Sequence, residues 1–376
     1  MENELRIIIS GGGTGGHIFP AVSIANAIKA KRPDAKILFV GAVGRMEMQR
    51  VPAAGYEIKG LPVRGLVRPL YSLKNVGVLL DYLRSKRMAK KIIRQFRPMV
   101  AVGVGGYASG AALDAAHSMG VPCLIQEQNS YAGKTNKMLG GKVQKICVAY
   151  DGMERFFPAG KIIKTGNPVR QSVVDADISK EDARASFGLK PDKKTILLVG
   201  GSLGARTINE SMKQHLDVVR DSDVQFIWQT GKYYNDEVNA AVEAFGKPDN
   251  LVVTDFIADM GAAYRSADLV VSRAGASSIS EFCLIGKPVV LVPSPNVAED
   301  HQTKNAMALV NRDAALYVKD ADAPATLLKV ALDTVHDDKK LASLSENIKQ
   351  LGEKDSAGII ADEVIKLATE NKSSWN

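Results

Sequence analysis

The chain has 376 residues, of which 45% are apolar and 24% are charged. This length is too great for one hydrophobic core and suits two domains, and the composition excludes a disordered or collagen-like chain. No apolar run approaches the roughly 18 residues that a membrane-spanning helix needs, so we expect no such helix.

Positive charge is concentrated in the first half of the chain. The formal net charge is +8, but residues 1–165 carry 25 Lys and Arg against 10 Asp and Glu, whereas the remainder carries 24 against 31. A basic first half suits an anionic partner on one side only, either nucleic acid or the cytoplasmic face of a membrane.

Two features indicate a protein that stays in a reducing compartment. The acidic start, Met1–Glu4, leads straight into a predicted strand and does not resemble a signal peptide. Cys123, Cys147 and Cys283 stand far apart among apolar neighbours, which predicts buried thiols and neither a disulfide set nor a metal site.

The first half alternates strands and helices. Helices are predicted near 17–31, 74–95 and 106–119, and the intervening strands are apolar throughout, as buried parallel strands should be. These strands are predicted at 5–9, 36–40, 99–104, 121–125 and 145–149. The turn signal Gly166-Asn167-Pro168 then breaks the pattern and predicts a domain junction.

The second half repeats this architecture without repeating the sequence. Strands are predicted at 195–200, 224–229, 251–254, 268–272, 288–292 and 315–318, with helices between them and a last helix over about 353–370. The pattern predicts an α/β chain of two doubly wound domains, whose parallel sheets face each other across a cleft.

Each half opens with a strand, a glycine turn and a helix. The turns are residues 11–17 and 200–206, and such a turn places backbone N–H groups and a helix N-terminus at one point, which favours phosphate. Gly11-x-Gly13-x-x-Gly16 formally matches the dinucleotide fingerprint. The next strand, however, ends in Gly41-Ala42 and lacks the acid that would hold a ribose, so a phosphate or diphosphate cradle is favoured over a nicotinamide dinucleotide.

Three further features of the first half carry candidate chemistry. His17 opens the first helix and could take a proton from an attacking hydroxyl, or could simply cap the loop. A third glycine turn, residues 103–110, offers either a second phosphate contact or tight packing. Glu127-Gln128-Asn129 follows a strand, where polar residues face a ligand crevice or form an ordinary loop.

The most specific segment lies in the second half. A strand ending at Ser272 is followed by the small-residue turn at residues 273–278 and by Glu281, about one helical turn inside the next helix. Such a turn lets a diphosphate approach the helix N-terminus, and the carboxylate can accept two hydrogen bonds from a ribose diol. The alternative is a solvated surface glutamate.

Metal and P-loop chemistry are not favoured. Asp175/Asp177, Asp221/Asp223 and Asp320/Asp322 are best explained by chance, because none follows a convincing strand. No His/Cys cluster suggests zinc, and no Walker-type phosphate loop is present.

The segment from Leu70 to Arg97 mixes apolar residues with many basic ones and contains one acid, Asp81. An amphipathic basic helix preceded by apolar residues is typical of a membrane-surface segment. The alternative is a core helix with a solvated basic face.

Six motifs occur in the order that one known family shows. They are 11–17, 105–107, 126–129, 166–170, 200–206 and 272–281. Together they resemble the MurG family of bacterial cell-wall glycosyltransferases, and the resemblance covers nearly the whole chain.

The resemblance implies a GT-B fold with an acceptor domain at 1–165, a UDP-sugar domain at 166–352 and a C-terminal helix at 353–376 that can pack back on the first. It implies an inverting transfer of N-acetylglucosamine from UDP-N-acetylglucosamine to the 4-hydroxyl of undecaprenyl-diphospho-N-acetylmuramoyl-pentapeptide. This reaction serves peptidoglycan synthesis, and through it cell shape and division. No cofactor, metal or nucleic acid is implied, and the enzyme would sit peripherally on the cytoplasmic face of the inner membrane, through Leu70 to Arg97.

The resemblance also implies site residues. Donor contacts are expected from Thr14, Gly15, Gly16, Asn129, Arg170, Ser202, Ile257, Ala276, Ser277, Ser278, Ile279, Ser280, Glu281 and Gln302. Acceptor-side contacts are expected from Gly13, Gly105, Gly106 and Tyr107, with His17 as candidate general base. Where family members often carry two adjacent glutamines, this chain has His301-Gln302.

Three other functions compete with this interpretation. A UDP-N-acetylglucosamine epimerase on the same fold would need no lipid acceptor. A nicotinamide-dependent oxidoreductase would use the Gly11-x-Gly13-x-x-Gly16 loop. A non-catalytic nucleic-acid binder would explain the basic half but leaves Glu281 and its turn without a purpose.

Overall fold

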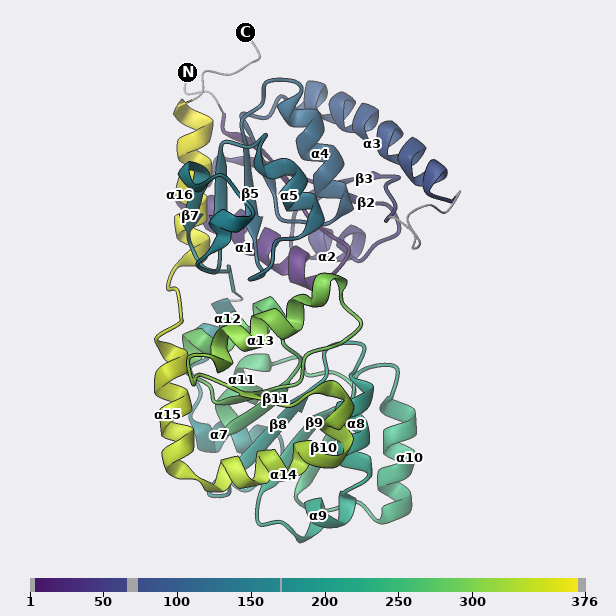
Figure 1. Ribbon diagram of the computed structural model, residues 1–376, viewed down its shortest axis with the longest axis vertical. Helices are drawn as coiled ribbons and strands as arrows, with labels where there is room; N and C mark the ends of the chain where they lie inside the picture. The colour runs from purple at the N-terminus through teal and green to yellow at the C-terminus, as the bar shows by residue number, and fades with distance from the viewer. Residues whose placement is uncertain (1–3, 66–73, 170, 371–376) are drawn as a thin grey trace. The chain divides into compact units, whose positions relative to one another are not determined.

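The computed structural model describes residues 4–65, 74–169 and 171–370 (Figure 1). The chain divides into two compact units. Unit 1 comprises the chain up to Val169 and again from Lys354, and unit 2 runs between them up to Glu353. The division falls just beyond the turn at residues 166–168, where the sequence predicts a junction.

Unit 1 is built on a parallel sheet of the order β3-β2-β1-β4-β5-β6-β7 among the described residues. Its strands are β1 (Arg6–Ser10), β2 (Lys36–Ala42), β3 (Glu57–Leu61), β4 (Val100–Gly103), β5 (Cys123–Glu127), β6 (Lys145–Val148) and β7 (Ile162–Lys164). The five predicted strands are confirmed, whereas β3 and β7 were not predicted. Both are edge strands with exposed polar positions, so they lack the apolar run that reveals a buried strand.

Helices cover both faces of this sheet. They are α1 (Gly15–Lys31), α2 (Glu47–Ala53), α3 (Lys74–Phe96), α4 (Tyr107–His117), α5 (Lys134–Gly140) and α16 (Ser356–Glu370), with 3-10 turns η1 (Met153–Arg155) and η2 (Ala159–Lys161). Ile8 of β1 packs in the core beneath α3, α4 and α5, whereas Ile7 and Ile9 pack beneath α1, α2 and α16. Because both faces of β1 are buried, the strand has no polar alternation.

The last helix, α16, joins unit 1 although it follows unit 2 in the chain. It packs along α1 (Figure 1). Lys31 Nζ, on α1, donates to Asp362 Oδ2 at 2.6 Å. Ile360, Val364 and Ala368 lie fully buried in the core beneath α1. Helix α16 therefore completes the core of unit 1.

Unit 2 has the sheet order β10-β9-β8-β11-β12-β13, again parallel in the described residues. The strands are β8 (Thr195–Val199), β9 (Gln225–Gln229), β10 (Leu251–Thr254), β11 (Leu269–Ser272), β12 (Val289–Leu291) and β13 (Leu316–Tyr317). All six correspond to predicted strands. The expected α/β class, with two doubly wound parallel sheets, is confirmed.

The unit 2 sheet is also covered on both faces. One face carries α8 (Arg206–Lys213), α9 (Leu216–Asp221), α10 (Asn235–Phe245) and α14 (Ala323–His336). The other carries α6 (Gln171–Val174), α11 (Met260–Ser266), α12 (Ala276–Ile285), α13 (His301–Val310) and α15 (Asp338–Lys349). The remaining elements are α7 (Lys180–Ser186), η3 (Ala298–Asp300) and η4 (Asp320–Asp322).

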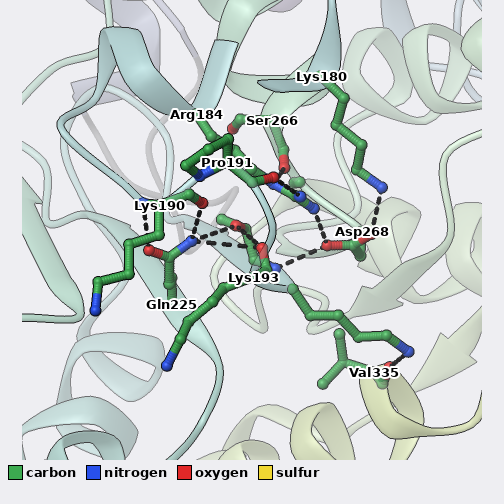
Figure 2. A network of polar contacts seen from close by, with 12 residues as sticks. Lys180, Arg184, Lys190, Pro191, Lys193, Gln225, Ser266, Asp268 and Val335 are labelled. Atoms are coloured by element: carbon green, nitrogen blue, oxygen red, sulfur yellow. Dashed lines mark hydrogen bonds and ion pairs between the residues drawn. The ribbon is translucent and has the colours of Figure 1, made fainter. Parts of the chain in front are cut away.

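The amino-terminal edge of this sheet is held by a polar network around Asp268 (Figure 2). The Asp268 carboxylate accepts hydrogen bonds from Lys180, from Arg184 Nη2 at 2.7 Å and from the Thr195 amide at 2.7 Å. Burial alone would raise the pKa of Asp268, but the hydrogen bonds from Lys180 and Thr195 outweigh it and hold the pKa below its usual value. The network ties α7 to β8 and β11.

Candidate active site

The first glycine loop, residues 11–16, is held from behind by a buried carboxylate. Glu47 is fully buried, and its Oε2 accepts from Gly13 N and its Oε1 from Ala42 N, both at 2.9 Å. A Cβ built on Gly12 would lie 2.2 Å from Glu47 Oε1, so this side chain leaves no room for one. The prediction of a bare amide is therefore wrong at Gly13, because Glu47 occupies it.

His17 lies at the start of α1 with its ring fixed by the same loop. Its Nδ1 is 3.0 Å from the carbonyl oxygen of Gly12. A carbonyl can only accept, so the neutral imidazole carries its proton on Nδ1 and its lone pair on Nε2. This tautomer is the one in which Nε2 can act as a base.

The third glycine turn packs directly against this histidine. A Cβ built on Gly105 would lie 2.8 Å from His17 Nε2, and one on Gly106 would lie 2.5 Å from the Gly12 carbonyl oxygen. Both glycines also have positive φ, at +99° and +89°. Close packing of two loops thus accounts for Gly105 and Gly106, and the following Tyr107 is 54% exposed.

Asn129 is positioned by a second buried carboxylate. Glu127, at the end of β5 and 1% exposed, accepts from Asn129 N at 3.0 Å and from Asn129 Nδ2 at 3.2 Å. Its other oxygen accepts from Gly133 N and Asn136 Nδ2, both at 2.9 Å. The parallel strands β1, β4 and β5 are neighbours in the sheet. His17, Gly105 and Asn129 each follow the carboxyl end of one of these strands, so they belong to the same end of the sheet.

The junction turn has a structural role in unit 1. Asn167 accepts from Gln126 Nε2 at 2.8 Å and donates to the Gln128 carbonyl at 3.0 Å, and all three side chains are buried. Arg170, which the family resemblance assigns to the donor site, lies outside the described residues.

In unit 2, two candidate binding features follow adjacent strands. Loop 200–204 follows β8, and the ten-residue helix α12 follows β11, which pairs with β8. Gly275 precedes α12, and the Ser277 side chain lies in its first turn. Within the described residues the Ser277 hydroxyl oxygen is buried and makes no hydrogen bond. The N-terminus of α12 thus offers backbone amides and a hydroxyl to an anion.

Glu281 is not the solvated residue that a lone helical glutamate would be. It is 2% exposed, and its Oε2 accepts a hydrogen bond from Tyr264 OH at 3.1 Å. Tyr264 is itself buried and stacks edge to face on Phe282, with ring centroids 5.3 Å apart. Sequence reasoning missed Tyr264, because nothing links this α11 tyrosine to α12 before the chain is folded.

The other predicted unit 2 residues surround these features. Ile257 is 5% exposed and shares a core with Ala274 and Ile279 at the α12 turn, and Ser202 is exposed. Gln302 Oε1, on α13, accepts from Ser294 N at 2.9 Å. Ser280 Oγ donates to the Ala276 carbonyl inside α12.

Arg273, in the turn before α12, has a structural role, because its guanidinium bonds to other residues of unit 2. Its Nη1 donates to the Val292 carbonyl at 3.0 Å and to Asp320, which also accepts from Thr207 Oγ1 at 2.6 Å. These bonds give a structural role to Asp320, one member of the Asp320/Asp322 pair. Among the described residues, no group of three or more His, Cys, Asp and Glu side chains could hold a metal ion.

Two predictions about the whole chain can also be compared with the structure. The three cysteines are free and buried, as predicted, and burial raises the pKa of each thiol to about 12. None of the described helices is both long and apolar enough to cross a bilayer.

Models of glycosyltransferase family 28 match both units. The family's N-terminal domain matches residues 7–148, and its C-terminal domain matches residues 195–359. Two α/β units, each built on a sheet of parallel strands and each carrying one of these sites, therefore define a glycosyltransferase of this class.

Similar proteins make the assignment narrower. A Bacteroides thetaiotaomicron protein named UDP-N-acetylglucosamine--N-acetylmuramyl-(pentapeptide) pyrophosphoryl-undecaprenol N-acetylglucosamine transferase is 68% identical, over 98% of this chain and 99% of its own length. A Bacteroides fragilis protein of the same name is 67% identical, over 98% and 97%. The crystal structure of Acinetobacter baumannii MurG is 27% identical with a TM-score of 0.75, covering 96% and 99%. The chain belongs to the MurG family of glycosyltransferase family 28.

A likeness to an epimerase concerns the fold alone. The crystal structure of a UDP-N-acetylglucosamine 2-epimerase has a TM-score of 0.67 and 15% identity, covering 99% of this chain and 98% of that one. Identity at this level carries no information about the reaction.

Proposed function

We propose that this enzyme transfers N-acetylglucosamine from UDP-N-acetylglucosamine to the 4-hydroxyl of an undecaprenyl-diphospho-N-acetylmuramoyl-pentapeptide. The relatives' name describes this donor and this lipid-linked acceptor. The single observation that carries the proposal is in unit 2: the buried Glu281, one turn inside α12, accepts a hydrogen bond from Tyr264 just behind the helix N-terminus. The N-terminus of α12 supplies an anion site, and the Glu281 carboxylate beside it supplies an acceptor for a diol.

The donor nucleotide is held by unit 2. Its diphosphate lies at the N-terminus of α12 and loop 200–204, where Ser277 and backbone amides replace a metal as the source of positive potential. The ribose diol donates to Glu281, which Tyr264 holds in place. Ile257 contacts the uracil, and the resemblance adds Ser202, Arg170, Gln302 and Ala276 to Ser280.

The acceptor is activated by unit 1. His17 Nε2 takes the proton of the acceptor's 4-hydroxyl while that oxygen attacks the anomeric carbon in line with the departing UDP. One such displacement inverts the α-linkage to β. Thr14, Gly15, Gly16 and Asn129 contact the donor sugar, and Gly13, Gly105, Gly106 and Tyr107 form the acceptor side. The reaction draws on both units and needs no cofactor.

Unit 1 also meets the lipid-linked acceptor at an anionic membrane surface. Helix α3 exposes the apolar side chains of Val76, Leu79, Leu80 and Leu83, and Leu79 is 59% exposed. Exposed basic side chains follow on the same helix, at Arg84, Arg87, Lys91 and Arg94. Lipid-facing lysines and arginines contribute about 1 kcal/mol each, so four of them localise the domain on the cytoplasmic face of the inner membrane. Leu70, Tyr71 and Leu73 lie outside the described residues.

A transfer assay tests this function. Radiolabelled UDP-N-acetylglucosamine is incubated with the enzyme and a lipid-linked acceptor, with and without EDTA. We expect label in the lipid fraction, with EDTA making no difference. Consumption of the sugar nucleotide without any acceptor would indicate an epimerase, and binding of NADH in place of UDP would indicate an oxidoreductase.

A further inference from the structure

One buried side chain in unit 2 bonds to two different loops. Gln229 is the last residue of β9 and is 4% exposed. Its Nε2 donates to the carbonyl of Gly201 and to the carbonyl of Asp255, both at 3.2 Å. Because β9 lies between β8 and β10, its end is adjacent both to loop 200–204 and to loop 255–259.

The orientation of this amide is determined by its partners. Both carbonyls can only accept, so the nitrogen must face them and Oε1 must face away. Within the described residues, Oε1 is buried and makes no hydrogen bond. A buried acceptor without a donor costs free energy comparable to what a hydrogen bond contributes. Core stability alone therefore does not require a glutamine here, because the cost of the unpaired Oε1 offsets what the two hydrogen bonds from Nε2 contribute.

The backbone that follows Gln229 contacts loop 200–204 and the end of β10, directly before loop 255–259. Lys232 N donates to the Ser202 carbonyl at 3.1 Å, and Thr230 N donates to the Thr254 carbonyl at 2.9 Å. A Cβ on Gly231 would lie 2.0 Å from Gly204 N, so the segments are in direct backbone contact. Gln229 adds a side-chain group that is bonded to both loops at once.

We propose that Gln229 is a positioning residue that sets the distance between the diphosphate and base subsites of the donor nucleotide. Ser202 is adjacent to Gly201, and Ile257 lies two residues beyond Asp255, so each carbonyl that Gln229 holds belongs to one subsite. The inference rests on the proposed function, in which unit 2 binds UDP-N-acetylglucosamine. The residue acts through the two loops and does not touch the reacting atoms.

The same strand offers a matched control. Gln225 is the first residue of β9, is 2% exposed and belongs to the network at the opposite edge of the sheet (Figure 2). Its Oε1 accepts from Lys190 N at 2.7 Å and its Nε2 donates to the Lys190 carbonyl at 2.8 Å. The two glutamines are thus both buried and both belong to β9, but they lie at opposite ends of this strand.

The test compares Q229L with Q225L by melting temperature and by the Kd for UDP in titration calorimetry. We expect Q229L to bind UDP about tenfold more weakly, because loop 200–204 and loop 255–259 lose the side chain that fixes their spacing, while its melting temperature falls no more than that of Q225L. Its preference for UDP over CDP should also fall, because the base loop loses its fixed distance. Q225L should melt at a lower temperature and bind UDP as the wild type does.

Wild-type affinity for UDP in Q229L would overturn the inference, as would equal weakening in both variants in proportion to lost stability. If Q229L does not fold, Q229M keeps the length and flexibility of the side chain and takes its place. Failure of the wild-type enzyme to bind UDP would overturn the proposed function, and it would be seen before any variant is compared.

Discussion

The two units place a glycine loop after equivalent strands but hold it with opposite groups. Loop 11–16 follows β1 and loop 200–204 follows β8, and each strand is third in its sheet order. In unit 1 a buried carboxylate, Glu47, accepts from the Gly13 amide. In unit 2 a neutral amide, Gln229, donates to the Gly201 carbonyl.

This difference separates two functions of one structural motif. The Glu47 carboxylate accepts from the Gly13 amide and so withdraws that donor from any ligand, whereas Gln229 donates to a carbonyl and occupies no amide of loop 200–204. The first loop instead orients His17 through the Gly12 carbonyl. A glycine-rich turn thus predicts that a ligand or another segment can approach the backbone closely. The side chains that bond to the turn determine which of its amides and carbonyls are left for a ligand.

The largest expected effect comes from removing the candidate base in unit 1. His17→Ala should lower kcat by about a hundredfold or more, because no group then takes the acceptor proton. The Kd for UDP should stay unchanged, since unit 2 supplies the nucleotide contacts. Steady-state transfer kinetics and calorimetry measure the two quantities. His117→Ala, an exposed histidine at the end of α4, is the control, and near-normal turnover in His17→Ala would show that another group is the base.

In unit 2 we expect a substitution to weaken nucleotide binding. Glu281→Ala should weaken UDP binding by about thirtyfold, as expected for the loss of hydrogen bonds to a charged group. UDP and its 2′-deoxy analogue should then bind almost equally, because the carboxylate is what distinguishes them. Tyr264→Phe, which removes one supporting hydrogen bond, should show a smaller effect of the same kind. Unchanged discrimination against the deoxy analogue would contradict the assignment of Glu281 to the ribose.

Glu47→Gln tests whether the carboxylate supports the first loop. A glutamine can accept from only one of Gly13 N and Ala42 N, so the free energy of unfolding should fall by about 1 to 2 kcal/mol. Turnover should fall with it, through disorder at Gly12 and His17, while the Kd for UDP stays the same. Chemical denaturation and transfer kinetics provide the measurements. A gain in UDP affinity would mean that the first loop binds phosphate after all.

The smallest expected effect is the acid dependence of unit 2. Because the pKa of Asp268 is held below its ordinary value of 3.8, its contribution to stability is present above that pH and is lost as the pH falls through the folded-state value. The contribution is on the order of 1 kcal/mol after allowance for solvent screening. Asp268→Asn should therefore reduce the loss of stability as the pH falls from about 5 to about 3, a range that spans the ordinary value of 3.8, where that loss begins. Chemical denaturation at both pH values measures this loss. An equal loss of stability in Asp268→Asn and in the wild type would contradict the prediction.

Much of the fold follows from local sequence pattern. Apolar runs such as Ile7–Ile9 and Leu269–Val271 predict strands buried on both faces, and the interleaved helices predict parallel doubly wound sheets. The edge strands β3 and β7 lack this signal because polar, exposed residues interrupt their apolar positions, at Glu57 and Lys59 in β3 and at Lys164 in β7. Glu281 could be singled out as well, since its position after a glycine turn is a local feature.

The sequence by itself determined the α/β class, the glycine turns, the basic first half and the resemblance to a glycosyltransferase family. Only the tertiary structure decided which distant side chains support those turns: Glu47 stands 34 residues from Gly13, Tyr264 17 from Glu281, and Gln229 28 from Gly201. The physical reason is that periodicity reports whether a segment is buried, whereas hydrogen bonds between remote loops depend on which strand ends are neighbours in the folded sheet.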